Sequence, residues 1–244
     1  MHDRLLEFRS QVRTYEWAEF RDISLRPGSE AVALYEKRKA NQQEEIEKWL
    51  GEGQTRQIRQ QILILRQCPH IFQESEKWAT AIQELVTIGR PAVPELISEL
   101  HRSERRAPRT LIAFTLRAIG DRQVVPALIE ELGRSEYKGE YGLNLKDKQL
   151  AAFIQKYQHR PPRDRDGEVN YIMIGCPVIE ITAALEKITG HSEGHEHFGH
   201  KATAELGPDA PSEQWQKRVQ EIVQETAERW QKWWEQHKDE FISR

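Results

Sequence analysis

Apolar residues in the middle of the chain recur at the spacing of one helical face. Counting from Val93, the next apolar positions are Leu96, Ile97 and Leu100. They lie three, four and seven residues on, which is the periodicity of an amphipathic α-helix. The same spacing returns later at Val125, Leu128, Ile129 and Leu132. The pattern predicts two helices of one design.

Glycine and proline mark the boundaries of these helices. Gly89 and Gly120 are 31 residues apart (120 − 89), and Pro94 and Pro126 are 32 apart (126 − 94). Glycine adopts the left-handed conformation that ends a helix, and proline is tolerated in the first turn of the next one. The spacing therefore predicts a helix–turn–helix unit used twice.

Periodicity predicts further helices on both sides of this pair. We expect helices at Gln54–Gln67, Glu74–Ile88, Ala92–His101, Pro108–Ile119, Gln123–Gly133, Lys146–Tyr157, Ile172–Ile188 (the main part of it after Pro177) and Ser212–His237. The last carries a tryptophan stripe, which we interpret as core.

The repeat does not run the whole length of the chain. After Gly120 the next such glycine is Gly190, 70 residues on (190 − 120), so an insertion separates them. The predicted parts are an N-terminal helical cap (1–53), repeats (54–133), an insertion (134–170), a repeat helix (171–190), a histidine-rich loop (191–211) and a tryptophan-rich capping helix (212–241).

The two units resemble a known repeat family. The strings from Ile88 to Ile97 and from Ile119 to Ile129 are similar to HEAT-like repeats of the phycobilisome-lyase type, most closely over 74–133. The resemblance resumes at 183–190 and 230–234, as in the C-terminal caps of many bacterial proteins of this type. It implies an all-α fold, an α-α superhelix (solenoid) with non-repeat capping helices. The family name does not imply a lyase.

Arg109 and Asp121 match recurring positions of that repeat. We expect a ladder of Arg–Asp hydrogen bonds between repeats. In the preceding repeat Arg90 occupies the aspartate position, so the ladder is expected to break there.

Composition limits the classes of partner. The chain has 244 residues and a formal net charge of −3, which favours neither nucleic acid nor an anionic membrane. The N-terminus lacks the apolar stretch of a signal peptide, and no apolar run is long enough to cross a bilayer. Cys68 and Cys176 are expected to be free buried thiols. We expect a soluble cytoplasmic protein.

Arginines gather at two places and form a candidate interaction surface. Arg102, Arg105 and Arg106 lie in the turn between the two helices of predicted repeats, and the insertion loop adds others. The full set is Arg102, Arg105, Arg106, Arg160, Arg163 and Arg165. Guanidinium groups on one face hold acidic protein segments or phosphates, although a charged turn also serves solubility alone.

Four histidines, His191, His195, His197 and His200, lie within ten residues. Imidazoles at this density can bind zinc, nickel or iron. The zincin spacing is missed, because Gly199 stands where the second histidine belongs. A solvated loop without metal is the competing interpretation, and no other cofactor is expected.

No motif for nucleophilic catalysis, phosphate cradling or dinucleotide binding occurs in the sequence. The sequence therefore favours a protein–protein interaction scaffold or adaptor, without catalysis of its own, whose insertion sets specificity for another protein. The alternative is a cofactor- or metal-related protein, such as a tetrapyrrole lyase-like subunit or a metal carrier through the His191–His200 loop.

Overall fold

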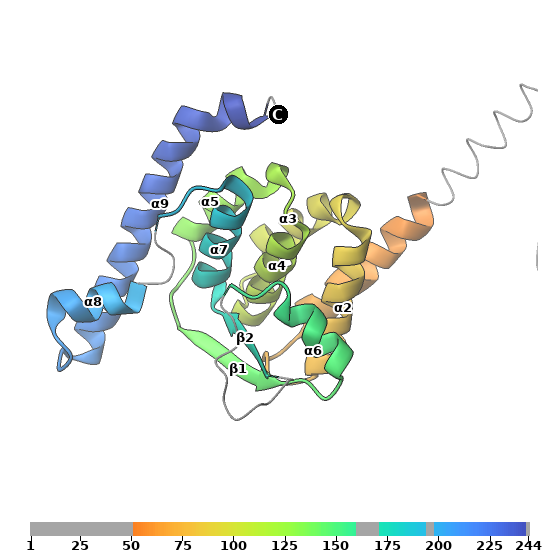
Figure 1. Cartoon of the computed structure of the whole chain (residues 1–244), viewed down its shortest axis with the longest axis horizontal. Helices are drawn as coiled ribbons and strands as arrows, with labels where there is room; N and C mark the ends of the chain where they lie inside the picture. Colours follow the sequence, from red (N-terminus) through yellow and green to blue (C-terminus); the bar gives the residue numbers. More distant parts are fainter. Residues whose placement is uncertain (1–50, 160–170, 194–197, 243–244) are drawn as a thin grey trace, which may run out of the picture. The chain divides into compact units, whose positions relative to one another are not determined.

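The computed structural model describes residues 51–159, 171–193 and 198–242. The chain divides into two compact units, Met1–Gly51 and Glu52–Arg244. The second unit is mostly helical (Figure 1). The N-terminal cap predicted for 1–53 lies outside the described residues, except for 51–53.

The helices follow one another with short connections. Residues 51–67 are helical, and the remaining α-helices are α2 (Ser75–Ile88), α3 (Val93–Arg102), α4 (Arg106–Ile119), α5 (Val125–Gly133), α6 (Lys148–Gln155), α7 (Pro177–Thr189), α8 (Phe198–Leu206) and α9 (Ser212–Ile242). Two short 3-10 turns, η2 (Arg90–Ala92) and η3 (Arg122–Val124), precede α3 and α5. The helices predicted in the repeat region are confirmed, with ends that differ by up to three residues.

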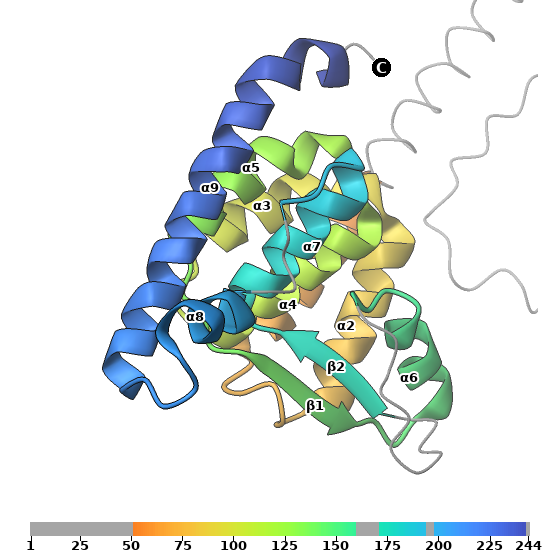
Figure 2. The same ribbon diagram turned by 60° about the vertical axis from the view of Figure 1, so that its left-hand side comes forward.

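These helices pack in two rows. In one row α2 contacts α4 and α4 contacts α7; in the other α3 contacts α5 and α5 contacts α9. Figures 1 and 2 show α4 and α7 side by side, with α9 running along the outside of α5. Since α4 has neighbours in both rows, Leu111, Phe114 and Leu116 are completely buried.

Both predicted boundary glycines have a positive φ, but only Gly120 is in the left-handed helical conformation, with ψ of 26°, whereas Gly89 has ψ of −134° and lies outside it. Gly89 and Gly120 both have φ of 73° and follow the last residue of a helix. Pro94 and Pro126 lie in the first turn of α3 and α5. The prediction of two helix–turn–helix pairs is confirmed.

A two-stranded antiparallel sheet interrupts the helices. β1 (Glu140–Asn144) pairs with β2 (Tyr171–Gly175), with Gly142 opposite Met173. The prediction of an entirely helical fold was wrong here. In β2, Ile172 and Ile174 are buried on one face, so the segment before Pro177 follows a period of two, which is that of a strand. A Cβ at Gly142 would collide with the end of the Tyr171 side chain, so a larger residue at this strand position would have to displace that ring.

The histidine-rich region also differs from the prediction. Within 191–211, which was expected to be a loop, α8 packs against α9 and buries Phe198 and Ala202. These two residues are four apart and so share a helical face, which the surrounding glycines and histidines obscured.

The predicted long C-terminal helix is confirmed, and its tryptophans differ in burial. Trp230 and Trp234 are buried, whereas Trp215 and Trp233 pack against the core half-buried. Cys68 and Cys176 are both buried and unbridged. Every helix in the described residues is too short or too polar to cross a membrane.

Candidate interaction surface

The contacts between helical pairs differ from the expected Arg–Asp ladder. Asp121 binds Arg90, with Nε to Oδ2 at 3.0 Å, and Arg109 instead contacts Glu131 at 2.5 Å. The ion pair between repeats therefore occurs where the ladder was expected to break. Arg90 and Asp121 lie at equivalent positions, directly after Gly89 and Gly120, so opposite charges at one repeat position suffice to join neighbouring pairs.

Two buried glutamates recur in the row of α3 and α5. Glu99 and Glu131 are each 1% exposed. Arg102 reaches Glu99 at 2.5 Å, and Arg134 reaches Glu131 at 3.3 Å, each from three residues further along the helix. His101 also contacts Glu131 at 3.0 Å and so ties α3 to α5. Buried carboxylates thus fix cations at the C-terminal ends of both helices, where the helix dipole also favours positive charge.

A shallow groove of about 420 Å³ lies between the helix over 51–67 and α3. Its charged lining consists of three arginines and two glutamates, namely Arg59, Arg66, Arg102, Glu95 and Glu99. Arg59 pairs with Glu95 at 3.0 Å and Arg102 with Glu99. Among the described residues the Arg66 side chain has no ion-pair partner. The groove therefore carries an excess of positive charge.

A smaller pocket of about 270 Å³ adjoins the start of α4. It is lined by Pro69, His70, Ile71, Arg105, Arg106, Ala107 and Tyr141. Tyr141 belongs to β1, so the insertion contributes one wall. The Cζ atom of Arg106 lies 4.6 Å from the centre of the Tyr141 ring, within the range of a cation–π contact.

Three aromatic rings surround this pocket. His70 stacks on Phe72 with ring centres 5.1 Å apart, and both rings meet Tyr141 edge-on. Phe72 is 51% exposed, which is unusual for a large apolar side chain that is already stacked. We call these three rings and the arginines Arg105 and Arg106 the Arg106 pocket.

Of the six arginines in the predicted interaction surface, the structure describes three. Arg102 faces the groove, and Arg105 and Arg106 line the Arg106 pocket. The structure brings these three together around the turn that joins α3 to α4. Arg160, Arg163 and Arg165 lie outside the described residues.

Two of the four predicted metal-ligating histidines are described. His191 donates from Nε2 to Oε1 of Glu193 at 2.8 Å and stacks on Trp233 with ring centres 4.9 Å apart. His200 lies exposed on α8. His195 and His197 lie outside the described residues, so the metal site stays a prediction. Within the described part of the chain, no three His, Cys, Asp or Glu side chains form a group suited to a metal ion.

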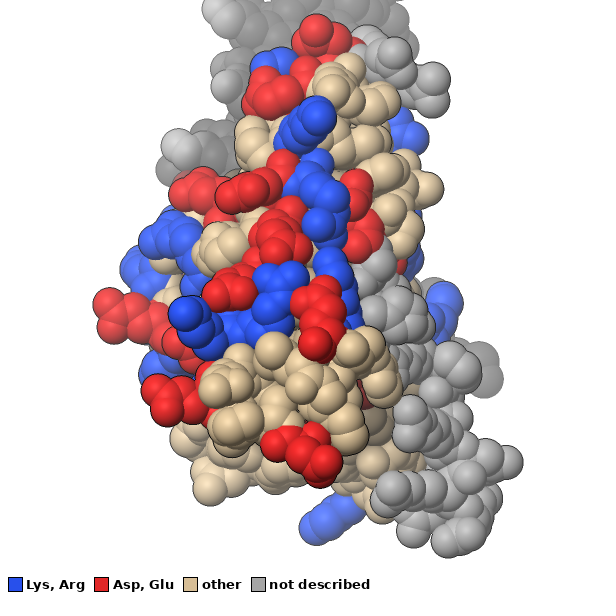
Figure 3. Space-filling view, turned by 90° about the vertical axis from the view of Figure 1, so that its left-hand side faces the viewer, with Lys and Arg blue, Asp and Glu red and all other residues tan. Residues whose placement is uncertain are grey.

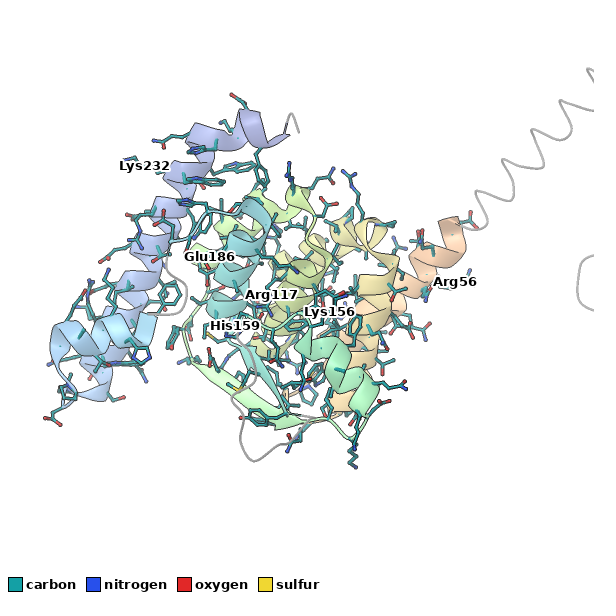
Figure 4. The ribbon with its side chains drawn as sticks, viewed as in Figure 1. Arg56, Arg117, Lys156, His159, Glu186 and Lys232 are labelled. Carbon is teal, nitrogen blue, oxygen red and sulfur yellow. The ribbon has the colours of Figure 1, made fainter. Side chains whose placement is uncertain are left out.

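Sequence reasoning missed a buried charge network that joins α4, α7 and β1. Arg117 and Glu180 are 1% and 0% exposed, and Nη2 of Arg117 lies 2.8 Å from Oε2 of Glu180. The side chain of His159 is 1% exposed; its Nε2 lies 2.9 Å from Glu140 and its Nδ1 3.6 Å from Glu180. Figure 4 shows Arg117 and His159 close together beside α7.

The protonation states in this network support one another. Burial by itself lowers the pKa of His159, but the hydrogen bond to Glu140 and the nearby negative charge of Glu180 outweigh it and raise that pKa above its usual value. Burial by itself raises the pKa of Glu180, but Arg117 and His159 outweigh it and lower that pKa. Because these charges are shielded from solvent, removal of one partner would leave an uncompensated buried charge in the network.

A sequence signal for this network existed but was weak. Gly175 donates its backbone N–H to Glu180 at 2.7 Å, and a Cβ at Gly175 would collide with Ile179. The glycine five residues before a glutamate therefore marks the close approach of strand β2 to helix α7.

The face formed by α8 and α9 has a different charge pattern. Figure 3 shows Lys and Arg interleaved with Asp and Glu over this face. Arg218, for example, binds Glu205, Glu221 and Glu225. Positive charge here is largely compensated, unlike at Arg66 and Arg106.

Comparison of the chain with protein-family models, with curated proteins and with solved structures finds no match.

Proposed function

We propose that this protein is a protein–protein interaction adaptor built on a solenoid of HEAT-like repeats. The two rows of helices support the solenoid, because equivalent helices of successive pairs contact one another. The recurring Glu99–Arg102 and Glu131–Arg134 pairs support it as well. Stacked helix pairs of this kind present extended surfaces to partners.

The observation that carries the proposal is the uncompensated arginine surface around the α3–α4 turn. Arg66 and Arg106 have no ion-pair partner among the described residues, and each lines a concavity. Elsewhere in the described chain, arginines such as Arg109 and Arg218 are paired. Free guanidinium groups beside shallow concavities favour an acidic segment of another protein, since a formal net charge of −3 does not favour nucleic acid.

The insertion is proposed to set the specificity. Tyr141 of β1 stands against Arg106 of α4, so a change in the insertion alters the pocket without altering the helical rows. Loops inserted into repeat proteins frequently form part of the binding face. The two unbridged cysteines also support the proposal that the protein works in the cytoplasm.

Quantitative affinity capture from the native lysate tests this function. The wild-type chain is compared with Arg66→Glu, which reverses a charge without breaking a native ion pair. Lys232→Glu is the matched control, since Lys232 is an exposed cation on α9 (Figure 4). We expect one stoichiometric partner with wild type and Lys232→Glu, reduced at least about tenfold with Arg66→Glu. Equal capture by all three, or no stoichiometric partner, contradicts the proposal.

A further inference from the structure

The Arg106 guanidinium forms no ion pair with any carboxylate among the described residues. It makes no hydrogen bond or ion pair with any described residue, and its Nε is buried without a partner. The carboxylate of Glu136 influences it electrostatically without pairing with it, and that carboxylate already lies 3.6 Å from Lys138. A ligand in the pocket does not reach this enclosed Nε and would instead accept from the Nη groups of Arg106.

The orientation of both arginines is fixed before any ligand arrives. Arg106 is held over the Tyr141 ring, and Arg105 donates from Nη2 to the carbonyl oxygen of Cys68 at 2.6 Å. The remaining N–H groups of two neighbouring guanidiniums therefore line one small volume. Preorganised donors lose little conformational entropy on binding, and none of the described residues that line the pocket is acidic.

The size and rim of the pocket restrict the ligand. At about 270 Å³ it lies below the range of about 300–1,000 Å³ that encloses whole cofactors or drug-sized molecules. It therefore accepts a part of a larger partner. The half-exposed Phe72, stacked on His70 at the rim, offers a face for an apolar or aromatic neighbour of the anion.

We propose that the Arg106 pocket binds the carboxylate of an aspartate or glutamate in a partner protein, with an adjacent aromatic residue packed on Phe72 and His70. This inference rests on the proposed function for the source of the segment, and it names the chemistry that the partner presents. Arg106 and Arg105 donate to the carboxylate, and Tyr141 of the insertion closes the pocket beside them. The same oxyanion chemistry would accept a phosphate, so the test includes one.

Nuclear magnetic resonance titration of the full chain tests the pocket directly. The probes are acetyl-Asp-Phe-amide, its neutral isostere acetyl-Asn-Phe-amide, and phenyl phosphate. The arginine Nε–Hε signals report the contact. We expect saturable shifts of the Arg106 signal with the aspartyl probe, and binding at least about tenfold weaker with the asparaginyl probe.

Variants assign the effect to the pocket. Arg106→Gln is expected to weaken binding of the aspartyl probe at least about tenfold. Arg56 is an exposed arginine on the helix over 51–67 (Figure 4), and Arg56→Gln is expected to leave binding of the probe unchanged. If Arg106→Gln fails to fold, the comparison of aspartyl and asparaginyl probes on wild type decides alone. Equal binding of these two probes, no saturable shift, or preferential binding of phenyl phosphate overturns the proposal. Probe binding without any captured partner would instead refute only the adaptor function.

Discussion

Glu99 and Glu131 occupy the same position in consecutive helical pairs, 32 residues apart (131 − 99), and both are buried to 1% exposure. Their partners differ in exposure. The Arg102 side chain that binds Glu99 is 64% exposed, whereas the Arg109 side chain that binds Glu131 is 14% exposed. One repeat position therefore supports two electrostatic environments.

Glu131→Gln is expected to destabilise the fold more than Glu99→Gln. Glu131→Gln leaves the mostly buried Arg109 without a carboxylate partner and weakens the contacts that His101 and Arg134 make with this residue. We therefore expect the free energy of unfolding to fall by about 3 kcal/mol. After Glu99→Gln the exposed Arg102 side chain can be solvated instead, so we expect the free energy of unfolding to fall by only about 1 kcal/mol. Urea unfolding measures both. Equal losses would show that the exposure of the partner does not govern the cost.

Gly120→Ala tests the helix boundary. At a φ of 73° an alanine is strained, so we expect a loss of about 1–2 kcal/mol in the free energy of unfolding. Gly53→Ala is the matched control, because Gly53 lies in the helix over 51–67 with open space around it. There we expect a gain of about 0.5–1 kcal/mol. A gain at Gly120 would contradict the assigned conformation.

The tryptophans of α9 are expected to differ. Trp230 is 0% exposed, so Trp230→Ala should cost about 3–5 kcal/mol. Trp233 is half-buried and stacks between His191 and His237, so Trp233→Ala should cost about 1–2 kcal/mol. Chemical denaturation of the two variants measures the difference. Similar costs would mean that the stacked histidines bury Trp233 as fully as the core buries Trp230.

His159 is expected to make stability depend on pH. Its pKa in the folded chain is raised above the ordinary 6.5, so its contribution is fully present below that value and is lost as the pH rises through the folded pKa. The pKa of Glu180 is lowered from 4.5, so its contribution is present above that value and is lost as the pH falls through the folded pKa.

Urea unfolding at pH 6 and pH 8 isolates the histidine. We expect wild type to lose more stability than His159→Gln between these values, since the variant retains every other titrating group. An identical pH dependence of stability in the two proteins would show that protonation of His159 does not stabilise the fold.

The sequence predicted the helical pairs well because they depend on local rules. Val93 with Leu96 and Leu100, and the glycine and proline positions, specify helices and their ends within a few residues of chain. The strand at Tyr171–Gly175 was missed because its pairing partner, Glu140–Asn144, lies far away in sequence. Pairing of that kind leaves little trace in local periodicity.

The candidate site was predictable only in part. The cluster of Arg102, Arg105 and Arg106 was visible as composition, but Tyr141 joins it only through the fold. The Arg117–Glu180 pair was also invisible, because both residues occur in helices where a charge is ordinarily exposed. Long-range contacts decide which charges are compensated, and this distinguishes Arg106 from Arg117.

The most direct test of the adaptor account is hydrogen–deuterium exchange of the chain with its captured partner. We predict slower amide exchange on binding in residues 59–66, in α3, at the start of α4 and in β1, because these elements line the groove and the Arg106 pocket. Protection confined to α8 and α9, with the arginine surface unchanged, would contradict the account and place the interface at the α9 end of the row formed by α3, α5 and α9.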